Sequence, residues 1–314
     1  LTNETIFSQT TRPDHLLILG GGPIGMEMAQ AHQRLGCQVT VIEAAKALGR
    51  DDPEAAAVVL DALRGEGVTI LEGVAVTQLA MQGHQVCATL ADGRLVTGSH
   101  LLVATGRAVH LDHLNLDAAG VAFTRKGVTV GQNLRSSNRR VYAVGDAAGG
   151  LQFTHVAGAH AGVIIRQFLF GLPARAATVI PWVSYTDPEL AQIGLTEAQA
   201  RAAHGPALTV IRQEFHHNDR ALATGKAKGF LKLMLIKSRP VGVTIVGSGA
   251  GEMIGLWALV MNSRLKIGAV AGTILPYPTL GEISRRAAGA YFSPKLFESV
   301  WVKRVVGMVQ RYIP

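Results

Sequence analysis

The chain has 314 residues, of which 48% are hydrophobic and 17% charged, and this predicts about two or three domains with sizeable cores and excludes a disordered protein. The formal net charge of +8 at pH 7 would favour acidic partners, but no run of Lys and Arg exceeds two residues, so we expect no nucleic-acid binding. Cys37 and Cys87 are the only cysteines and have no paired spacing, which predicts a reducing, cytoplasmic location and no metal site.

The first predicted elements are a strand, a glycine-rich turn, a helix and a second strand. "HLLIL" at 15–19 leads into "GGGPIG" at 20–25, the helical pattern "MEMAQAHQRLG" follows, and the apolar run "CQVTVIE" ends at Glu43. This order is the complete dinucleotide-binding fingerprint. We therefore expect a Rossmann-like NAD(P)-binding domain rather than a glycine-rich turn that binds nothing.

Each residue of the turn has a physical task in cofactor binding. Gly20 permits the tight turn, Gly22 lets the backbone approach a pyrophosphate, and Gly25 lets the helix pack close to the strand. Ile24 lies in the first helical turn, where free amides and the positive end of the helix dipole face the phosphates.

The acidic residue at the end of the second strand predicts which nicotinamide dinucleotide is bound. The carboxylate of Glu43 can accept hydrogen bonds from ribose hydroxyls and would repel a 2′-phosphate. No arginine stands at positions 43 to 45 to bind that phosphate, although Lys46 and Arg50 are nearby. We therefore expect NADH to be preferred over NADPH.

Further along, "LLVATGR" at 101–107 predicts a late strand of the same sheet, and its turn residue Gly106 is a further candidate for cofactor binding. Turn-rich sequence between the two parts predicts a meander of strands. "RVYAVGD" then predicts a strand that stops at Gly145 and Asp146 before a helical pattern. An aspartate in that position can bind a polyol or ribose, but Gly-Asp often only turns the chain.

These segments together resemble the flavin-dependent pyridine nucleotide–disulfide oxidoreductases, the group of dihydrolipoamide dehydrogenase, glutathione reductase and mercuric reductase. The resemblance covers essentially the whole chain and rests on segments that occur in this order: "LTNETIFSQTTRPDHLLILGGGPIGMEMA", "LLVATGR", "RVYAVGDAAGG…LQFTHVAGAHAG", "YTDPELAQIGLTE" and "NDRALATGKAKGFLKLMLI…GVTIVGSGAGEMI". It implies an α/β protein with an NAD(P)-binding domain at 1–111, a remnant of an FAD-binding domain at 112–178 and an α+β dimerisation domain at 179–314.

The resemblance also implies roles for two acidic residues. Asp146 matches the aspartate that binds the ribityl chain of FAD. Glu27 matches an acidic position near the meeting of nicotinamide and flavin, although it could also be only a polar helix position. The family's N-terminal segment, with its own GxGxxG and a CxxxxC redox disulfide, does not occur in this sequence. We therefore expect a fragment that binds NAD, that binds FAD only in the full-length protein, and that does not turn over alone.

Residues 275–284 read "LPYPTLGEIS" and allow both a structural and a functional interpretation. Thr279 and Glu282 fit a capping box at a helix start, and the two prolines predict a stiff connector. Members of the family that exchange thiols have His-Pro-Thr and a following Glu here, whereas this chain has Tyr277. Because the pKa of tyrosine is about 10, it is a poor proton shuttle at neutral pH.

That tyrosine predicts an acceptor other than an ordinary dithiol, and Tyr277, Glu282 and Glu27 are the candidate catalytic residues. A tyrosine here is similar to mercuric reductases and soluble transhydrogenases, but the chain ends without the cysteine pair of true mercuric reductases. Three hypotheses remain: a mercuric reductase-like flavoenzyme acting on a disulfide, metal or other acceptor; a transhydrogenase or quinone-type reductase without a redox disulfide; and a non-enzymatic NAD-binding dimeric module.

The C-terminal sequence "SPKLFESVWVKRVVGMVQRY" predicts a basic amphipathic helix. We expect it to pack on the homodimer, with contact to a membrane surface as the alternative. The sequence does not identify the final electron acceptor.

Overall fold

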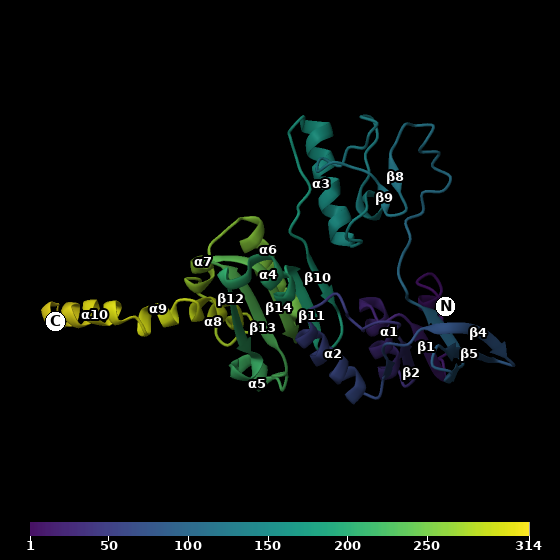
Figure 1. Ribbon diagram of the computed structural model, residues 1–314, viewed down its shortest axis with the longest axis horizontal. Coiled ribbons are helices and arrows are strands. Elements are labelled where there is room, and N and C mark those ends of the chain that lie inside the picture. The colour runs from purple at the N-terminus through teal and green to yellow at the C-terminus, as the bar shows by residue number, and fades with distance from the viewer. Residues whose placement is uncertain (314) are drawn as a thin grey trace. The chain divides into compact units, whose positions relative to one another are not determined.

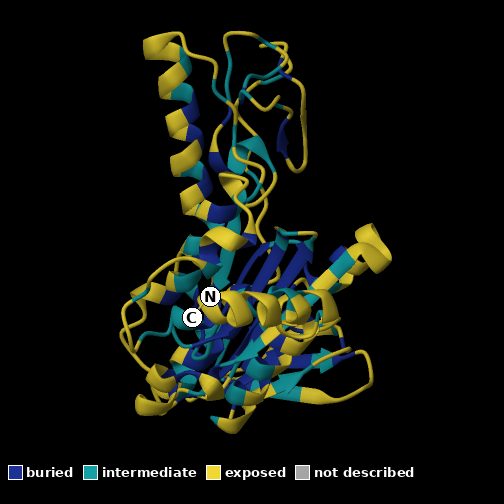
Figure 2. Ribbon diagram, turned by 90° about the vertical axis from the view of Figure 1, so that its left-hand side faces the viewer, coloured by how far each residue is buried: buried dark blue, intermediate teal, exposed yellow. Residues whose placement is uncertain are grey.

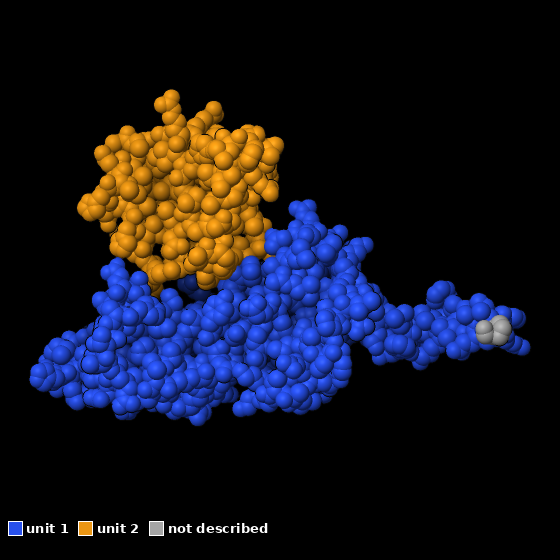
Figure 3. All heavy atoms as spheres, turned by 180° about the vertical axis from the view of Figure 1, so that it is seen from behind, with its two compact units in different colours: residues 1–105, 181–314 blue, residues 106–180 orange. Residues whose placement is uncertain are grey.

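The computed structural model describes residues 1–313, which form two compact units (Figure 3). The first unit contains Leu1–Thr105 and the chain from Pro181 onward, and the second unit contains Gly106–Ile180. The predicted three-part division at 111 and 178 remains a prediction, because the compact units group the first and last of these parts together.

The N-terminal part of the first unit is built on a parallel sheet with strand order β3-β2-β1-β7; Figure 1 labels β1 and β2 of this sheet. After the short 3₁₀ turn η1 (Ile6–Ser8), its strands and helices are β1 (His15–Leu19), α1 (Pro23–Arg34), β2 (Gln38–Ile42), α2 (Pro53–Gly65), β3 (Thr69–Leu71) and β7 (His100–Val103). The predicted strand–turn–helix–strand unit and the late strand are therefore present. A separate antiparallel sheet, β4 (Val76–Gln82), β5 (Gln85–Leu90) and β6 (Leu95–Gly98), is the predicted meander.

Strand β1 lies between β2 and β7, and both of its faces are buried. Leu16 and Ile18 face a core that includes α1 and α2, whereas Leu17 packs with Ala88 and Leu90 of the meander. Strands of parallel sheets that are covered on both faces read as continuous apolar runs rather than as alternating patterns. This explains the run "HLLIL" at 15–19.

The C-terminal part of the first unit is an antiparallel sheet with strand order β10-β11-β14-β13-β12. Helix α6 packs on β11 and β14, and α8 packs on β12 and β13. The strands are β10 (Pro181–Ser184), β11 (Glu189–Gly194), β12 (Leu208–Glu214), β13 (Phe230–Ile236) and β14 (Arg239–Gly247). The helices are α4 (Glu197–His204), η3 (Gly205–Ala207), η4 (Phe215–His217), α5 (Asp219–Ala223), α6 (Ala250–Asn262), α7 (Ile267–Ala271), α8 (Glu282–Ala290), α9 (Ser293–Phe297) and α10 (Val300–Tyr312).

The two parts of the first unit share one core. Leu190, Phe230 and Val246 of the antiparallel sheet belong to the same buried cluster as the residues of α1 and α2, and the strands that contribute them are mostly buried (Figure 2). The N-terminal and C-terminal parts of the unit are therefore packed as one body.

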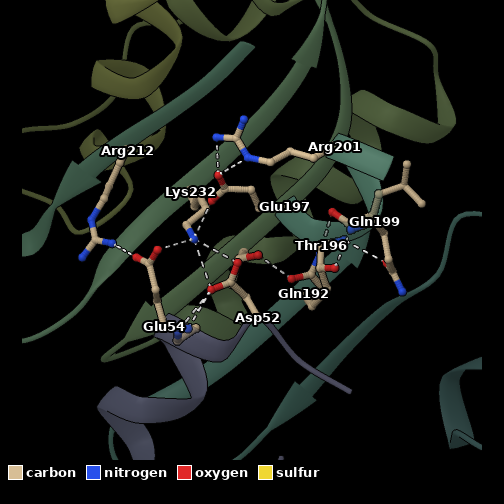
Figure 4. A network of polar contacts seen from close by, with 12 residues as sticks. Asp52, Glu54, Gln192, Thr196, Glu197, Gln199, Arg201, Arg212 and Lys232 are labelled. Carbon is tan, nitrogen blue, oxygen red and sulfur yellow. Dashed lines mark hydrogen bonds and ion pairs between the residues drawn. The ribbon is translucent and has the colours of Figure 1, made fainter. Parts of the chain in front are cut away.

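A buried lysine reinforces this packing (Figure 4). The Nζ atom of Lys232 on β13 lies 3.0 Å from Asp52, 3.4 Å from Glu54 and 2.8 Å from Glu197, while the lysine side chain is 3% exposed. Asp52 also accepts the backbone N–H groups of Glu54 and Ala55 as the N-cap of α2. The carboxylate of Asp52 thus caps the start of a helix in the N-terminal part and pairs with a strand of the C-terminal part.

The second unit contains η2 (Gly145–Ala148), α3 (Thr154–Phe170) and the short hairpin β8 (Phe123–Thr124) and β9 (Gly127–Val128). The helix predicted from "HVAGAHAGVIIRQFLFG" is present, but the predicted strand at 140–146 is wrong. Only an isolated bridge between Arg135 and Tyr142 forms there, and the chain turns into η2 at Gly145. An apolar run becomes a strand only when a neighbouring strand satisfies its backbone groups, and within the described residues this segment has only that one bridge.

Candidate functional site

The glycine turn at the end of β1 combines two packed glycines with one open glycine. Gly20 has φ +104°, and a Cβ atom there would collide with the carbonyl oxygen of Ala104 next to β7. A Cβ atom at Gly25 would collide with the carbonyl oxygen of Gly20. At Gly22 a Cβ atom would meet nothing within 4 Å. Gly20 and Gly25 therefore permit close packing, while Gly22 leaves open space where a cofactor can approach the protein backbone.

Helix α1 begins at this open position. Its N-cap is Gly22, no side chain caps it, and Pro23 occupies the first helical position. Because the amides of a first helical turn have no partners inside the helix, they can bind an anion. Ile24 in this turn is 48% exposed. The first turn of α1 therefore offers backbone N–H groups and the positive end of the helix dipole, without a side-chain cap.

Glu43 is fixed beside the same turn. One carboxylate oxygen accepts the backbone N–H of Gly21 over 2.7 Å, and the other accepts that of Ala45 over 2.8 Å. Glu43 directly follows β2, so its carboxylate lies at the carboxyl end of the parallel sheet, where ligands of such sheets bind. The two backbone donors orient the carboxylate but leave lone pairs available for further hydrogen bonds.

Glu27 lies on α1 and is half-buried. One of its carboxylate oxygens accepts the backbone N–H of Tyr185 over 2.9 Å. Burial raises the pKa of Glu27, and the hydrogen bond from Tyr185 lowers it by less. Glu27 thus connects the helix that follows the glycine turn to the segment between β10 and β11.

Three predicted cofactor residues belong to the second unit. Gly106 has φ +143°, and Gly145 has φ +57° and donates its N–H to Nδ1 of His160 over 3.1 Å. Asp146 is the second residue of the turn η2, and its half-exposed carboxylate lies 3.8 Å from Nη1 of Arg107. The exposed part of the carboxylate can accept hydrogen bonds from hydroxyl groups.

Tyr277 is anchored by a residue that sequence reasoning missed. Its hydroxyl group donates a hydrogen bond to Oδ2 of Asp219 over 2.9 Å, and its side chain is otherwise exposed. The hydrogen bond to Asp219 and the negative charge of that carboxylate raise the pKa of Tyr277. The aspartate directly follows Asn218, the N-cap of α5.

The capping box predicted for Thr279 and Glu282 is wrong. Helix α8 begins at Glu282 itself, with Gly281 as its N-cap and no side-chain cap. The hydroxyl of Thr279 instead donates to the carbonyl of Pro276 over 2.9 Å. The side-chain amide of Asn218 donates to the backbone carbonyl of Thr279. This tertiary contact holds the turn, and helix α8 begins only at Glu282.

The same turn leaves the carboxylate of Glu282 incompletely paired. Its Oε2 atom is buried and has no hydrogen-bond partner among residues 1–313. The structure thus brings Tyr277 together with Asp219 rather than with Glu282. No group of three metal-binding side chains occurs within the described residues.

Comparison with known proteins decides the family. Residues 1–161 match the family described as "Pyridine nucleotide-disulphide oxidoreductase", and residues 180–288 match its dimerisation domain. The chain belongs to the pyridine nucleotide-disulphide oxidoreductase family. The α/β fold class and the family resemblance predicted from the sequence are therefore confirmed.

Relatives with different acceptors are equally similar to the chain. It is 33% identical to a mercuric reductase of Streptomyces lividans over 300 residues, covering 93% of this chain and 63% of that protein. It is also 33% identical to a dihydrolipoyl dehydrogenase of Bacillus subtilis, covering 91% of this chain and 63% of that protein. The chain spans 51% of a mercuric reductase of Acidithiobacillus ferrooxidans. Sequence identity therefore does not identify the acceptor.

Solved structures agree with the fold. The HOCl-induced flavoprotein disulfide reductase RclA from Escherichia coli superimposes with a TM-score of 0.84 at 28% identity, covering 92% of this chain and 67% of that one. LpdA from Mycobacterium tuberculosis superimposes with a TM-score of 0.87 at 26% identity, covering 93% and 64%. These two structures share the fold of this chain.

Proposed function

We propose that the chain supplies the nicotinamide-binding and interface parts of a flavin-dependent oxidoreductase whose electron donor is NADH. The observation that carries this proposal is the open position at Gly22 beside the oriented carboxylate of Glu43. The first helical turn of α1 binds the pyrophosphate, and Glu43 accepts hydrogen bonds from the ribose. A 2′-phosphate placed beside that carboxylate would be repelled, which favours NADH over NADPH.

The residues of the second unit fit the polyol part of a flavin. Asp146 offers a half-exposed carboxylate, and Gly145 has the left-handed conformation that lets the chain turn sharply into η2. FAD, when bound, supplies the two-electron chemistry that links a hydride donor to an acceptor. Asp146 would hold the ribityl hydroxyls, and Glu27 would lie near the nicotinamide. We further propose that residues 180–288 form a homodimer through the dimerisation domain.

Tyr277 argues against thiol exchange driven by a histidine. Its pKa is raised further by Asp219, so the phenol stays protonated at neutral pH and does not act as a general base. Because the hydroxyl proton is directed at Asp219, the oxygen lone pairs remain available to accept a hydrogen bond or to bind a metal ion. We propose an acceptor that is not an ordinary dithiol, with a metal ion as the first candidate. One solved relative is described as a Cu(II) complex of RclA.

Two experiments on the full-length protein test this function. It should release flavin on denaturation; a colourless protein would overturn the flavoenzyme proposal and leave the non-enzymatic NAD-binding module. Anaerobic NADH oxidation should then be compared with Hg(II), Cu(II), lipoamide, glutathione disulfide, a quinone and NADP⁺ as acceptors. Faster turnover with lipoamide or glutathione disulfide than with metal ions would contradict the role given to Tyr277. Turnover only with quinone or NADP⁺ would favour the reductase without a redox disulfide.

A further inference from the structure

Most residues of the C-terminal helix α10 (Val300–Tyr312) are exposed, and only Val302 and Val305 are partly covered. None of its residues is buried, and Trp301, Met308 and Tyr312 are 72%, 57% and 76% exposed. The helix also lies beyond residue 288, where the match to the dimerisation domain ends. The sequence predicted one helix for this region, but the structure has two, because Ser299 accepts the N–H of Val302 and starts a new helix after α9.

At about 100° per residue, the side chains of α10 separate into two faces. The apolar face carries Trp301, Val302, Val305, Val306, Met308, Val309 and Tyr312. The opposite face carries Val300, Lys303, Arg304, Gly307, Gln310 and Arg311. A continuous apolar surface of this kind in water marks an interaction site.

The charges of the helix favour one occupant of that face. All three charged residues of α10 are cationic: Lys303, Arg304 and Arg311. An anionic lipid surface would attract these three cations. Trp301 and Tyr312 on the apolar face suit the boundary between headgroups and acyl chains, where amphipathic aromatic rings are favoured.

The length of the helix decides how it would meet a bilayer. Its 13 residues extend about 20 Å, which is shorter than the roughly 30 Å hydrocarbon core. Among the described residues, no helix is long and apolar enough to cross a membrane. We propose that α10 lies in the plane of an anionic bilayer surface, with its apolar face in the headgroup boundary and its basic face toward the lipid phosphates.

Vesicle binding of the purified 314-residue chain tests this proposal. The chain should co-sediment with phosphatidylcholine vesicles that contain phosphatidylglycerol, and not with pure phosphatidylcholine vesicles. Binding should weaken as salt is raised, because screening removes the electrostatic attraction. Trp301 emission should shift to shorter wavelength on binding, and Trp301→Phe should abolish that shift while preserving binding. Absence of binding to the anionic vesicles would overturn the proposal.

Paired variants separate the helix from the overall charge. Lys303→Gln/Arg304→Gln should weaken binding roughly 25-fold, since each basic residue near an anionic surface contributes about fivefold. Arg139→Gln/Arg140→Gln removes the same charge from exposed positions in the second unit and should leave binding unchanged. Equal losses in both variants would show that only net charge matters and would overturn the assignment to α10.

A third variant distinguishes the bilayer from a second copy of the chain. Trp301→Ser/Met308→Ser should weaken vesicle binding about tenfold or more while leaving the thermal midpoint and the oligomeric state unchanged. If this variant instead dissociates an oligomer and the parent chain ignores vesicles, the apolar face is a contact between copies and the proposal fails. The proposal is independent of the electron acceptor.

Discussion

The hydroxyl group of Tyr277 donates to the carboxylate of Asp219 over 2.9 Å, across a separation of 58 residues. This contact stabilises the neutral phenol and opposes its ionisation, so the pKa of Tyr277 lies above its ordinary value of 10.0. Asp219→Asn should therefore lower the pKa of Tyr277 by removing the negative charge. The pKa of Tyr277 is measured by difference absorbance titration, with Tyr277→Phe as the reference protein.

Glu282→Gln is the control for that titration, because Glu282 raises the pKa of Tyr277 less than Asp219 does. The shift caused by Glu282→Gln should be the smaller of the two. A larger shift in Glu282→Gln than in Asp219→Asn would show that the tyrosine is held by the other carboxylate in solution.

Replacement of Glu43 tests the ribose contact. Glu43→Ala should weaken NADH binding by about 10- to 100-fold, because a hydrogen bond to a charged acceptor contributes roughly 1.5–3 kcal/mol. Isothermal calorimetry measures the affinity. Glu72→Ala is the matched control, since Glu72 also accepts a backbone N–H of this loop, that of Ala47. Equal losses in both variants would mean that Glu43 supports the loop rather than the ribose.

Two glycine substitutions should separate an effect on thermal stability from an effect on NADH binding. Gly25→Ala should lower the thermal midpoint by several degrees, because its Cβ atom would collide with the carbonyl oxygen of Gly20. Gly22→Ala should leave the midpoint nearly unchanged, since Gly22 has φ −74° and open space around it, yet it should weaken NADH binding at least tenfold. Unchanged affinity in Gly22→Ala would place the pyrophosphate elsewhere.

Replacement of the buried Lys232 should strongly lower the free energy of unfolding. Lys232→Met leaves the carboxylate of Asp52 buried without its cation and should cost about 3–5 kcal/mol of unfolding free energy, measured by urea denaturation. Lys226→Met is the control, because Lys226 forms only an exposed ion pair with Asp187 at 3.9 Å and should cost less than about 1 kcal/mol. Similar losses would show that the buried network adds little.

Acid should destabilise the chain partly through Glu197. Burial raises the pKa of Glu197, but hydrogen bonds from Lys232 and Arg201 outweigh this effect and hold the pKa below the ordinary value of 4.5. The stabilisation is therefore complete above that ordinary value and is lost as the pH falls through the lower, folded-state pKa. Glu197→Gln should reduce the loss of stability in urea titrations below pH 4.5; an unchanged acid dependence would contradict the pairing.

Local sequence patterns predicted the elements between His15 and Glu43 well, because each of these patterns depends on residues that are close together in the sequence. The glycine turn, the helix start and the acidic strand end all lie between His15 and Glu43, and the structure contains each of them. Which of these residues contact a cofactor remains a prediction.

Contacts across long separations could not be predicted in the same way. The strand expected at 140–146 needed a neighbour that local sequence does not reveal. The capping box at Thr279 failed because Asn218, 61 residues earlier, holds the carbonyl of Thr279. Asp219 was missed for the same reason, since nothing near Tyr277 in the sequence indicates its partner.

The contact between Asp52 and Lys232 also constrains how the chain is made, because 180 residues separate them. At roughly 5–20 residues per second, Lys232 is synthesised about 10–40 s after Asp52. During that interval Asp52 lacks its cationic partner, and Val246 of the shared core is not yet synthesised. The N-terminal part of the first unit therefore leaves the ribosome before the strands that share its core, and residues 106–180 are synthesised between them.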